Sequence, residues 1–225
     1  MTAKATHLAL FDLDHTLLDG DSNTLWLKFL VERGHLPEST RQQQQHYMAR
    51  YATEQLDIED YLAFHLRLLA ARPLTEWLPL REAFIAERIV PRISVAARQT
   101  IARHRALGHR PAIITATHDF LSRAIAAQFD APVIAPKSEV RDGHFTGRID
   151  GAICFRERKL ACLSAWLQDQ ELDGRSIGEC HFYTDSANDL PLLEMSSHPV
   201  AVNADARLTA LAEERGWPTL CWRCS

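Results

Sequence analysis

The stretch LALFDLDHTLLDGDS, residues 8–22, decides the fold of this 225-residue chain. It opens with apolar residues, which predict a short buried strand, and it places Asp12 and Asp14 where that strand must end. Buried carboxylates repel each other and lose hydration, so the pair is costly unless protons or a cation neutralise it. Hard divalent metals prefer carboxylate and carbonyl oxygens. The stretch therefore predicts a metal site at the end of the strand; the simpler alternative is a turn in which an aspartate caps the chain.

The composition limits the classes of protein to consider. An apolar content of 46% is enough to bury the core of one sizeable domain, or of a domain with an insertion. The net charge of −4 gives no sign of a nucleic-acid surface. Residues 1–12 lack the pattern of a secretory signal, and no apolar stretch approaches the roughly 20 residues that span a bilayer. We expect a cytoplasmic protein without nucleic-acid or membrane partners; oligomeric state is not indicated.

The cysteines are odd in number and lie late in the chain, which favours a reducing compartment over a disulfide framework. Cys221 and Cys224 form a C-x-x-C pair close to the end of the sequence. A single such pair is a weak sign of zinc or redox chemistry, because zinc would need further ligands and a redox pair would need a helix start after a strand. No role is assigned to this pair.

Residues 21–92 are almost purely helical in pattern. Polar residues suited to helix starts, namely Ser22, Ser39, Asp57 and Thr75, precede or open segments with apolar residues at helical spacing. The expected helices cover residues 22–33, 39–51, 58–71 and 77–89. We therefore expect an all-helical cap domain, inserted directly after the first strand.

From residue 94 onward, helical and strand patterns alternate, which is typical of a parallel sheet covered by helices. Asp142-Gly143 is a strong signal for a two-residue hairpin turn within residues 138–149. The expected strands are 110–115, 133–135, 181–183 and 200–202, and the expected helices 94–107, 120–129, 156–170, 190–195 and 206–215. The fold class is thus α/β, a doubly wound parallel sheet, with residues 1–20 and 93–225 as the catalytic core.

Polar side chains follow the predicted strands at one edge of this sheet. Ligands of open α/β sheets bind beyond the carboxyl ends of the strands. Asp12 and Asp14 end the first strand, Thr115 ends another, and Asp185 follows the strand at 181–183. Lys159, near the start of a helix, can bring an ammonium to the same edge. Each residue alone has an ordinary structural explanation, but their joint occurrence at successive strand ends points to phosphoryl transfer.

The residue types suggest the roles. Asp12 and Asp185, with a backbone carbonyl, can bind Mg²⁺, and Asp12 can attack phosphorus to form an aspartyl phosphate. Asp14 can act as general acid and base. Thr115 can hold phosphate oxygens, and Lys159 can neutralise the transferring group. The last residues of the set, Asn188 and Asp189, lie at a helix start and can orient the metal ligands and the lysine.

These residues resemble the four motifs of the haloacid dehalogenase superfamily, in order and at suitable separations. The motifs are D-x-D-x-T at residues 12–16, IITAT at the end of a strand, Lys159, and TDSANDLPLLE. The helical insertion resembles the C1-capped branch, and the hairpin followed by the lysine helix resembles its phosphoserine phosphatase-like members, which include histidinol-phosphate phosphatases. The resemblance implies Asp12, Asp14, Thr115, Lys159 and Asp185 as the reacting set, with the Asp14 carbonyl as a metal ligand and Mg²⁺ as cofactor.

The chain also departs from phosphoserine phosphatases. It has TDSAND instead of GDGxND in the fourth motif and TAT instead of a glycine-rich second motif. The glutamate that meets the substrate ammonium in those enzymes is replaced by Asp21, so an ammonium partner is retained while serine phosphate becomes doubtful. The alternative for Asp21 is an acid that caps a helix beside Ser22.

The expected function is hydrolysis of a small phosphorylated metabolite, with histidinol phosphate and phosphoserine as candidates. The resemblance indicates that dehalogenases lack the second acid, so Asp14 disfavours that reaction. A phosphomutase on the same core and a non-catalytic binding module remain as alternatives. Polar cap residues are candidates to face the substrate, although at helical spacing an equal number face solvent: His46, Arg50, His65 and Arg67.

Overall fold

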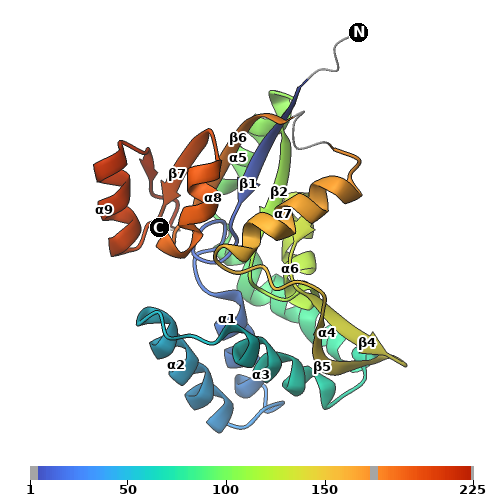
Figure 1. Cartoon of the computed structure of the whole chain (residues 1–225). Helices are drawn as coiled ribbons and strands as arrows, with labels where there is room; N and C mark the ends of the chain where they lie inside the picture. Colours follow the sequence, from blue (N-terminus) through green and yellow to red (C-terminus); the bar gives the residue numbers. More distant parts are fainter. Residues whose placement is uncertain (1–4, 173–176, 224–225) are drawn as a thin grey trace.

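The core of the protein is a parallel six-stranded sheet with the strand order β3-β2-β1-β6-β7-β8 (Figure 1). The computed structural model describes residues 5–172 and 177–223. β1 lies in the middle of the sheet, between β2 and β6, and the strand order reverses beside it. The strands are β1 (Thr6–Phe11), β2 (Arg110–Ile114), β3 (Val133–Ile134), β6 (Ile177–Thr184), β7 (His198–Val202) and β8 (Thr219–Leu220).

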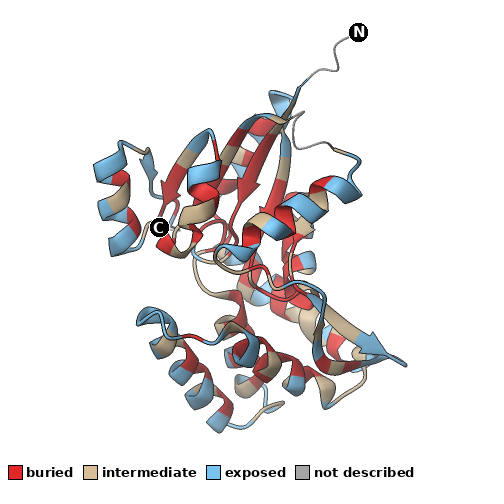
Figure 2. Ribbon diagram, in the orientation of Figure 1, coloured by how far each residue is buried: buried red, intermediate tan, exposed pale blue. Residues whose placement is uncertain are grey.

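Alternating residues of the central strands enter two different hydrophobic cores, because successive side chains of a strand point to opposite faces. Ala9 and Phe11 belong to the core under α5 (Val95–Ala106) and α6 (Asp119–Ala126). Leu8 and Leu10 belong to the core on the other face. That face is covered by α7 (Arg158–Asp169), α8 (Leu190–Met195) and α9 (Ala206–Arg215). Burial on both faces explains why the strand is an apolar run; the central strands are buried in Figure 2.

The helices inserted at residues 22–92, between β1 and α5, form a separate layer beyond the carboxyl ends of the strands (Figure 1). Their shared core is aromatic: the ring of Trp26 packs against Phe29, Trp77 and Phe84 at centroid distances of 5.1 to 6.2 Å. The elements are α1 (Ser22–Glu32), α2 (Ser39–Ala52), α3 (Ile58–Ala70), α4 (Leu74–Phe84), a π-helical turn η1 (Ile85–Ile89) and a 3-10 turn η2 (Val90–Arg92).

Two linkers join this helical layer to the sheet, and they pair with each other. Leu18 forms an isolated antiparallel bridge with Ile93, and the Asp19 N–H donates to the Arg92 carbonyl at 2.9 Å. Gly20 has φ of +135°, a conformation that other residues rarely adopt. The entry and exit of the insertion are therefore fixed side by side.

The hairpin of β4 (Lys137–Arg141) and β5 (His144–Asp150) lies against the helical layer although it follows β3 in the chain. The Leu74 N–H donates to the Gly143 carbonyl at 2.8 Å, and Phe145 packs on Phe120 with ring centroids 5.2 Å apart. The hairpin turn at Asp142-Gly143, both with positive φ, is as predicted. The hairpin thus contacts the inserted helices as well as the core.

The α/β fold class with a helical insertion after the first strand is confirmed, and three local predictions were wrong. The α1 cap is Asp21, which accepts from the Thr24 N–H, and Ser22 is already helical. Ser39 makes no cap, because α2 begins after Glu38 without a side-chain cap bond. Thr75 lies inside α4. Asp57 caps α3 as predicted.

Strand β8 was missed, because its pattern spans only Thr219–Leu220. Among the described residues no helix is long and apolar enough to cross a membrane. Cys221 is exposed with a free thiol, and Cys224, the other residue of the C-x-x-C pair, lies outside the described residues.

Candidate active site

A cavity of about 130 Å³ lies at the carboxyl ends of β1, β2 and β6, where the sheet meets the inserted helices. It brings together all the side chains that the sequence selects for chemistry, from segments distant in the chain. Those lining it are Asp12, Asp14, Asp21, Thr115, Lys159, Asp185, Asn188 and Asp189. The prediction that these residues share one neighbourhood is therefore met by the geometry.

Asp12 lies at the end of β1 and is held from two sides. Its N–H donates to the Tyr183 carbonyl of β6 at 2.8 Å. Its Oδ1 accepts from Lys159 Nζ at 2.7 Å, and the same ammonium donates to Asp189 Oδ2 at 2.8 Å. Asp189 also accepts from the Thr184 hydroxyl at 2.7 Å. One buried lysine thus joins the first acid of the first motif to the second acid of the fourth.

Asp14 is held by hydrogen-bond donors on both carboxylate oxygens. Its Oδ1 accepts from the Ser22 N–H at 2.7 Å, at the start of α1. Its Oδ2 accepts from the Thr117 hydroxyl at 2.7 Å. Thr117 in turn accepts from Asn23 Nδ2 at 3.3 Å. The carboxylate of Asp14 therefore has a fixed orientation at the junction between the core and α1.

The remaining predicted residues occupy distinct places on the cavity wall. Asp185 follows β6, and its Oδ1 accepts from the Thr16 hydroxyl at 3.1 Å. Thr115 is buried and accepts from the Thr117 N–H at 3.1 Å. Asn188, in the 3-10 turn η5 (Ala187–Asp189), accepts from Arg156 Nε at 3.2 Å.

Asp21 combines the two interpretations that the sequence left open. Its Oδ1 accepts from the Thr24 N–H at 2.7 Å and caps α1, and the residue also lines the cavity. The capping bond uses one carboxylate oxygen. Asp21 can therefore be a helix cap and also present negative charge to a bound molecule.

Burial controls the protonation of the nucleophile candidate. Desolvation, together with the neighbouring Asp189 and Asp14, raises the pKa of Asp12 to about 7, although Lys159 opposes the shift. Burial also disfavours the charge on Lys159, yet the carboxylates of Asp12 and Asp189 raise its pKa above the ordinary value. Lys159 therefore stays charged at neutral pH, and the raised pKa of Asp12 indicates that this one cation does not fully offset the burial and mutual repulsion of the acids around it.

The other carboxyl groups show the same effect. Burial, with repulsion from Asp21, raises the pKa of Asp14 to about 6. Burial, with repulsion from Asp12, raises the pKa of Asp185 well above the ordinary value. Among the described residues that line the cavity, Lys159 is the only lysine or arginine. An all-oxygen donor set that is buried and short of positive charge suits a hard divalent cation such as Mg²⁺.

Several contributors were missed by sequence reasoning. Thr117 positions Asp14, and Thr16 contacts Asp185, although both belong to motifs that were quoted without assigning them these contacts. The walls contributed by the inserted helices are mainly apolar or aromatic, from Met48, Tyr51, Leu56, Ile58 and Tyr61. The polar candidates His46, Arg50, His65 and Arg67 do not line the cavity.

His65 illustrates why the polar candidates were misleading. It is buried, and its Nε2 lies 3.1 Å from Gln44 Oε1 within the helical layer. The signal that could have found the true lining is the pattern of apolar residues around the link between α2 and α3. The same pattern is equally typical of residues that are buried in a hydrophobic core.

Comparisons with known proteins agree with this geometry. Residues 9–194 match the family model of haloacid dehalogenase-like hydrolases. The chain is 36% identical to a histidinol-phosphatase of Neisseria meningitidis serogroup C, covering 95% of this chain and 98% of the relative. It is 32% identical to the phosphoserine phosphatase SerB1 of Mycobacterium tuberculosis, covering 94% and 70%.

A crystal structure of a protein of unknown function from Bordetella pertussis Tohama I superposes with a TM-score of 0.91 at 38% identity. It covers 96% of this chain and 98% of its own length. The family predicted from the four motifs is confirmed: the chain belongs to the haloacid dehalogenase-like hydrolases.

Proposed function

We propose that the protein is a Mg²⁺-dependent phosphomonoester hydrolase that works through an aspartyl phosphate on Asp12. The observation that carries this proposal is the buried contact of Asp12 with Lys159, within a cavity that also holds Asp14 and Asp185. Asp12 attacks phosphorus and forms the acyl-phosphate bond as the bond to the leaving oxygen breaks. Lys159 stays charged throughout and neutralises the nucleophile and the transferring group.

Asp14 transfers the protons in both halves of this reaction. A pKa of about 6 lets it donate a proton to the leaving oxygen and then accept one from the attacking water near neutral pH. The Ser22 N–H and the Thr117 hydroxyl keep its carboxylate pointed into the cavity. Thr115, with backbone N–H groups after β2, holds oxygens of the phosphate.

Asp12, Asp185 and the backbone carbonyl of Asp14 would hold the Mg²⁺ ion. When bound, the metal supplies positive charge that offsets repulsion between the carboxylate nucleophile and the phosphate. Thr16 contacts Asp185 and Asp189 contacts Lys159, so the second carboxylate for the metal and the cation beside Asp12 are both held in place. Asn188 borders the same cavity beside Asp189.

The charge of the cavity favours a substrate with an ammonium group and no carboxylate. Asp21 supplies an anion at the wall, and Tyr51 and Tyr61 add aromatic surface. Lys159 is already engaged with Asp12 and Asp189. Arg156 borders the site, but its guanidinium donates to Asn188 and to the Glu54 carbonyl. Histidinol phosphate, the ester named by one relative, fits this pattern better than phosphoserine.

The inserted helices, residues 21–92, act as a cap that sets specificity and excludes water above the core of residues 1–20 and 93–225. Two features support a place in the reducing cytoplasm: the small-metabolite substrate, and the free thiols of Cys154, Cys162, Cys180 and Cys221.

Purified enzyme with Mg²⁺ tests the proposal on histidinol phosphate, phosphoserine and p-nitrophenyl phosphate. We expect hydrolysis of all phosphomonoesters to stop on chelation, and kcat/KM for histidinol phosphate to exceed that for phosphoserine at least tenfold. Full activity in excess EDTA would contradict the metal. A preference for phosphoserine would contradict the substrate class, and would direct attention to Arg156 as a carboxylate partner.

A further inference from the structure

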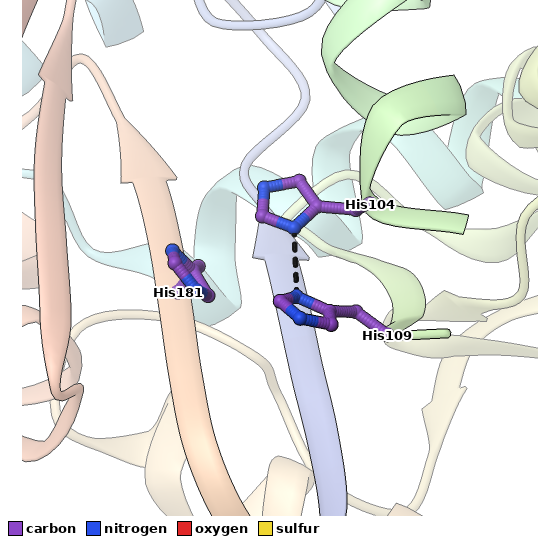
Figure 3. Close-up of side chains that lie close together, drawn as sticks. All are labelled: His104, His109 and His181. Atoms are coloured by element: carbon purple, nitrogen blue, oxygen red, sulfur yellow. Dashed lines mark hydrogen bonds between the residues drawn. The ribbon is translucent and has the colours of Figure 1, made fainter. Parts of the chain in front are cut away.

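A cluster of histidines lies between α5 and the sheet (Figure 3). His104 comes from the last turn of α5, His109 from the connection to β2, and His181 from β6. One ligand nitrogen of each lies within 4.8 Å of the others. His181 precedes Asp185 by four positions, about 13 Å along an extended strand. The cluster is therefore separate from the phosphate site.

The sheet is shaped to hold these rings. His181 lies opposite Ala9 of β1, the strand between β6 and β2. Ala9 is fully buried, and its methyl group leaves space on the α5 face that a larger apolar side chain would fill. The ring of His181 lies 4.7 Å from His104 and 5.3 Å from His109, centroid to centroid.

The hydrogen bonds place nitrogen lone pairs inside the cluster. His104 Nε2 lies 2.8 Å from the Tyr183 hydroxyl, and its Nδ1 lies 2.9 Å from His109 Nδ1. When His104 donates from Nε2 to Tyr183, its Nδ1 is an acceptor that shares the proton of His109. His181 Nε2 is buried and has no hydrogen-bond partner within the described residues. An unpartnered buried polar atom costs roughly 1–3 kcal/mol.

We propose that His104, His109 and His181 form a binding site for a divalent transition metal of the zinc type. Neutral imidazoles suit Zn²⁺, Co²⁺ and Ni²⁺, whereas Mg²⁺ prefers oxygen ligands. Burial, with repulsion from neighbouring histidines, lowers the pKa of His104 to about 4, so its ring is neutral at pH 7. The pKa of His181 is also lowered, by burial first and by His198 next.

Metal binding needs the rings to turn and one proton to move. The ion takes the place of the proton shared by the two Nδ1 atoms, and His109 carries that proton on Nε2 instead, so none is released. Zn–N bonds of about 2.0–2.1 Å in tetrahedral geometry put nitrogens roughly 3.3 Å apart, a few tenths of an ångström beyond the 2.9 Å between the two Nδ1 atoms. The ligand nitrogen of His181 lies within 4.8 Å of both. The contact from His104 Nε2 to Tyr183 then orients the ligand ring.

The open side of the cluster offers a further ligand. Glu179 Oε2 lies 3.8 Å from His181 Nε2 and 3.9 Å from His198 Nε2 at the exposed edge. The Nδ1 of His7 is already engaged, because it accepts from the Glu179 N–H at 3.0 Å. A metal here would tie α5, the α5–β2 connection and β6 together, and its role would be structural.

Titration calorimetry with Zn²⁺, on protein stripped of metal and then saturated with Mg²⁺, tests the proposal. Excess Mg²⁺ competes with zinc at the carboxylate site, and the histidine variants identify the zinc uptake that belongs to the cluster. We expect one Zn²⁺ per wild-type chain and at least tenfold weaker binding by His109→Gln and by His181→Gln. His46→Gln is the matched control, because His46 is exposed on α2, and should bind as wild type does.

Thermal melting separates a lost ligand from a damaged fold. His109 is partly exposed in a connection, so His109→Gln should melt like wild type in EDTA. Zn²⁺ should then raise the melting temperature of wild type and of His46→Gln but not of His109→Gln, because a ligand stabilises only the state that binds it. Equal zinc affinity in all four proteins, or no zinc uptake by Mg²⁺-saturated wild type, would overturn the proposal.

Discussion

Lys159 Nζ donates to Asp12 Oδ1 at 2.7 Å, across 147 positions of sequence. Both side chains are buried, and the same ammonium reaches Asp189 at 2.8 Å. A cation in this place reduces repulsion among acids that belong to different strand ends. The contact therefore holds distant segments of the site together and also compensates part of their negative charge.

Replacing Lys159 with methionine should abolish activity and destabilise the protein. The change keeps the chain length but leaves Asp12 and Asp189 buried without their cation, which typically costs about 3–5 kcal/mol. Urea unfolding at pH 7.5 measures this loss. Lys28→Met is the control, since the side chain of Lys28 is 53% exposed and its loss should change stability by less than about 0.5 kcal/mol. Equal stability of the two variants would contradict a structural role for the buried ammonium.

The raised pKa of Asp12 predicts a pH dependence of stability in metal-free protein. The folded-state pKa is about 7 against an ordinary value of 3.8, so the folded state binds more protons between these values. The stabilising contribution of the Asp12 carboxyl to the free energy of unfolding is complete below pH 4. It falls as pH rises towards 7, by up to about 1.4 kcal/mol per pH unit.

The comparison with Asp12→Asn isolates this group. In EDTA, the stability of wild type minus that of the variant should fall from pH 5 to pH 8. Denaturant titrations at unit pH steps provide the measurement. If this difference in stability stays constant or grows with pH, the pKa of the Asp12 carboxyl is not raised in the folded state.

Thr117→Val should slow turnover and shift its pH profile. The Thr117 hydroxyl donates to Asp14 and so favours the ionised form. Without it, the pKa of Asp14 rises, and the alkaline limb of kcat/KM, which reports loss of the protonated acid, should move to higher pH with a fall in kcat of about tenfold or more. Thr100→Val, distant on α5, should leave the profile unchanged. If the alkaline limb of the kcat/KM profile does not shift in Thr117→Val, the Thr117 hydroxyl does not influence the pKa of Asp14 during turnover.

Asp21→Asn should separate substrate recognition from folding. Asparagine is as good a helix cap as aspartate, so α1 should keep its cap and the melting temperature should change little. The KM for histidinol phosphate should rise at least tenfold, while p-nitrophenyl phosphate, which has no ammonium, should be hydrolysed as before. A parallel loss for both esters would mean that Asp21 serves catalysis or structure instead.

Mg²⁺ should stabilise wild type but not Asp185→Asn. The amide keeps an acceptor for the Thr16 hydroxyl, so the fold is retained while the anionic ligand is lost. Wild type should melt at a higher temperature with millimolar Mg²⁺ than in EDTA. An equal Mg²⁺-induced rise in the variant would place the metal elsewhere.

The reacting residues could be predicted from sequence because β1 is buried on both faces, so that polar residues at its end stand out. Asp12 and Thr115 follow apolar runs, Asp185 follows the buried end of β6, and the parallel sheet brings these strand ends together. Lys159 was found through its motif, since nothing in the spacing of α7 alone marks it as buried.

The supporting residues depend on tertiary contacts that local pattern does not encode. Thr117 contacts Asp14 because the loops after the neighbouring strands β1 and β2 meet, and Asn23 of α1 donates to the same Thr117 hydroxyl. The cap wall was missed for a related reason: Tyr51 and Tyr61 resemble core residues, and their side chains face the cavity only in the folded arrangement of α2 and α3. The histidine cluster likewise joins residues from separate elements.

The most direct test is to trap the covalent state on Asp12. Asp14→Asn should still be phosphorylated by p-nitrophenyl phosphate, whose leaving group needs no proton, but should not activate water to hydrolyse the product. Borohydride reduction of the quenched enzyme, followed by peptide mass spectrometry, should find homoserine at position 12. No reduced residue at that position, or reduction at another aspartate, would contradict Asp12 as the nucleophile.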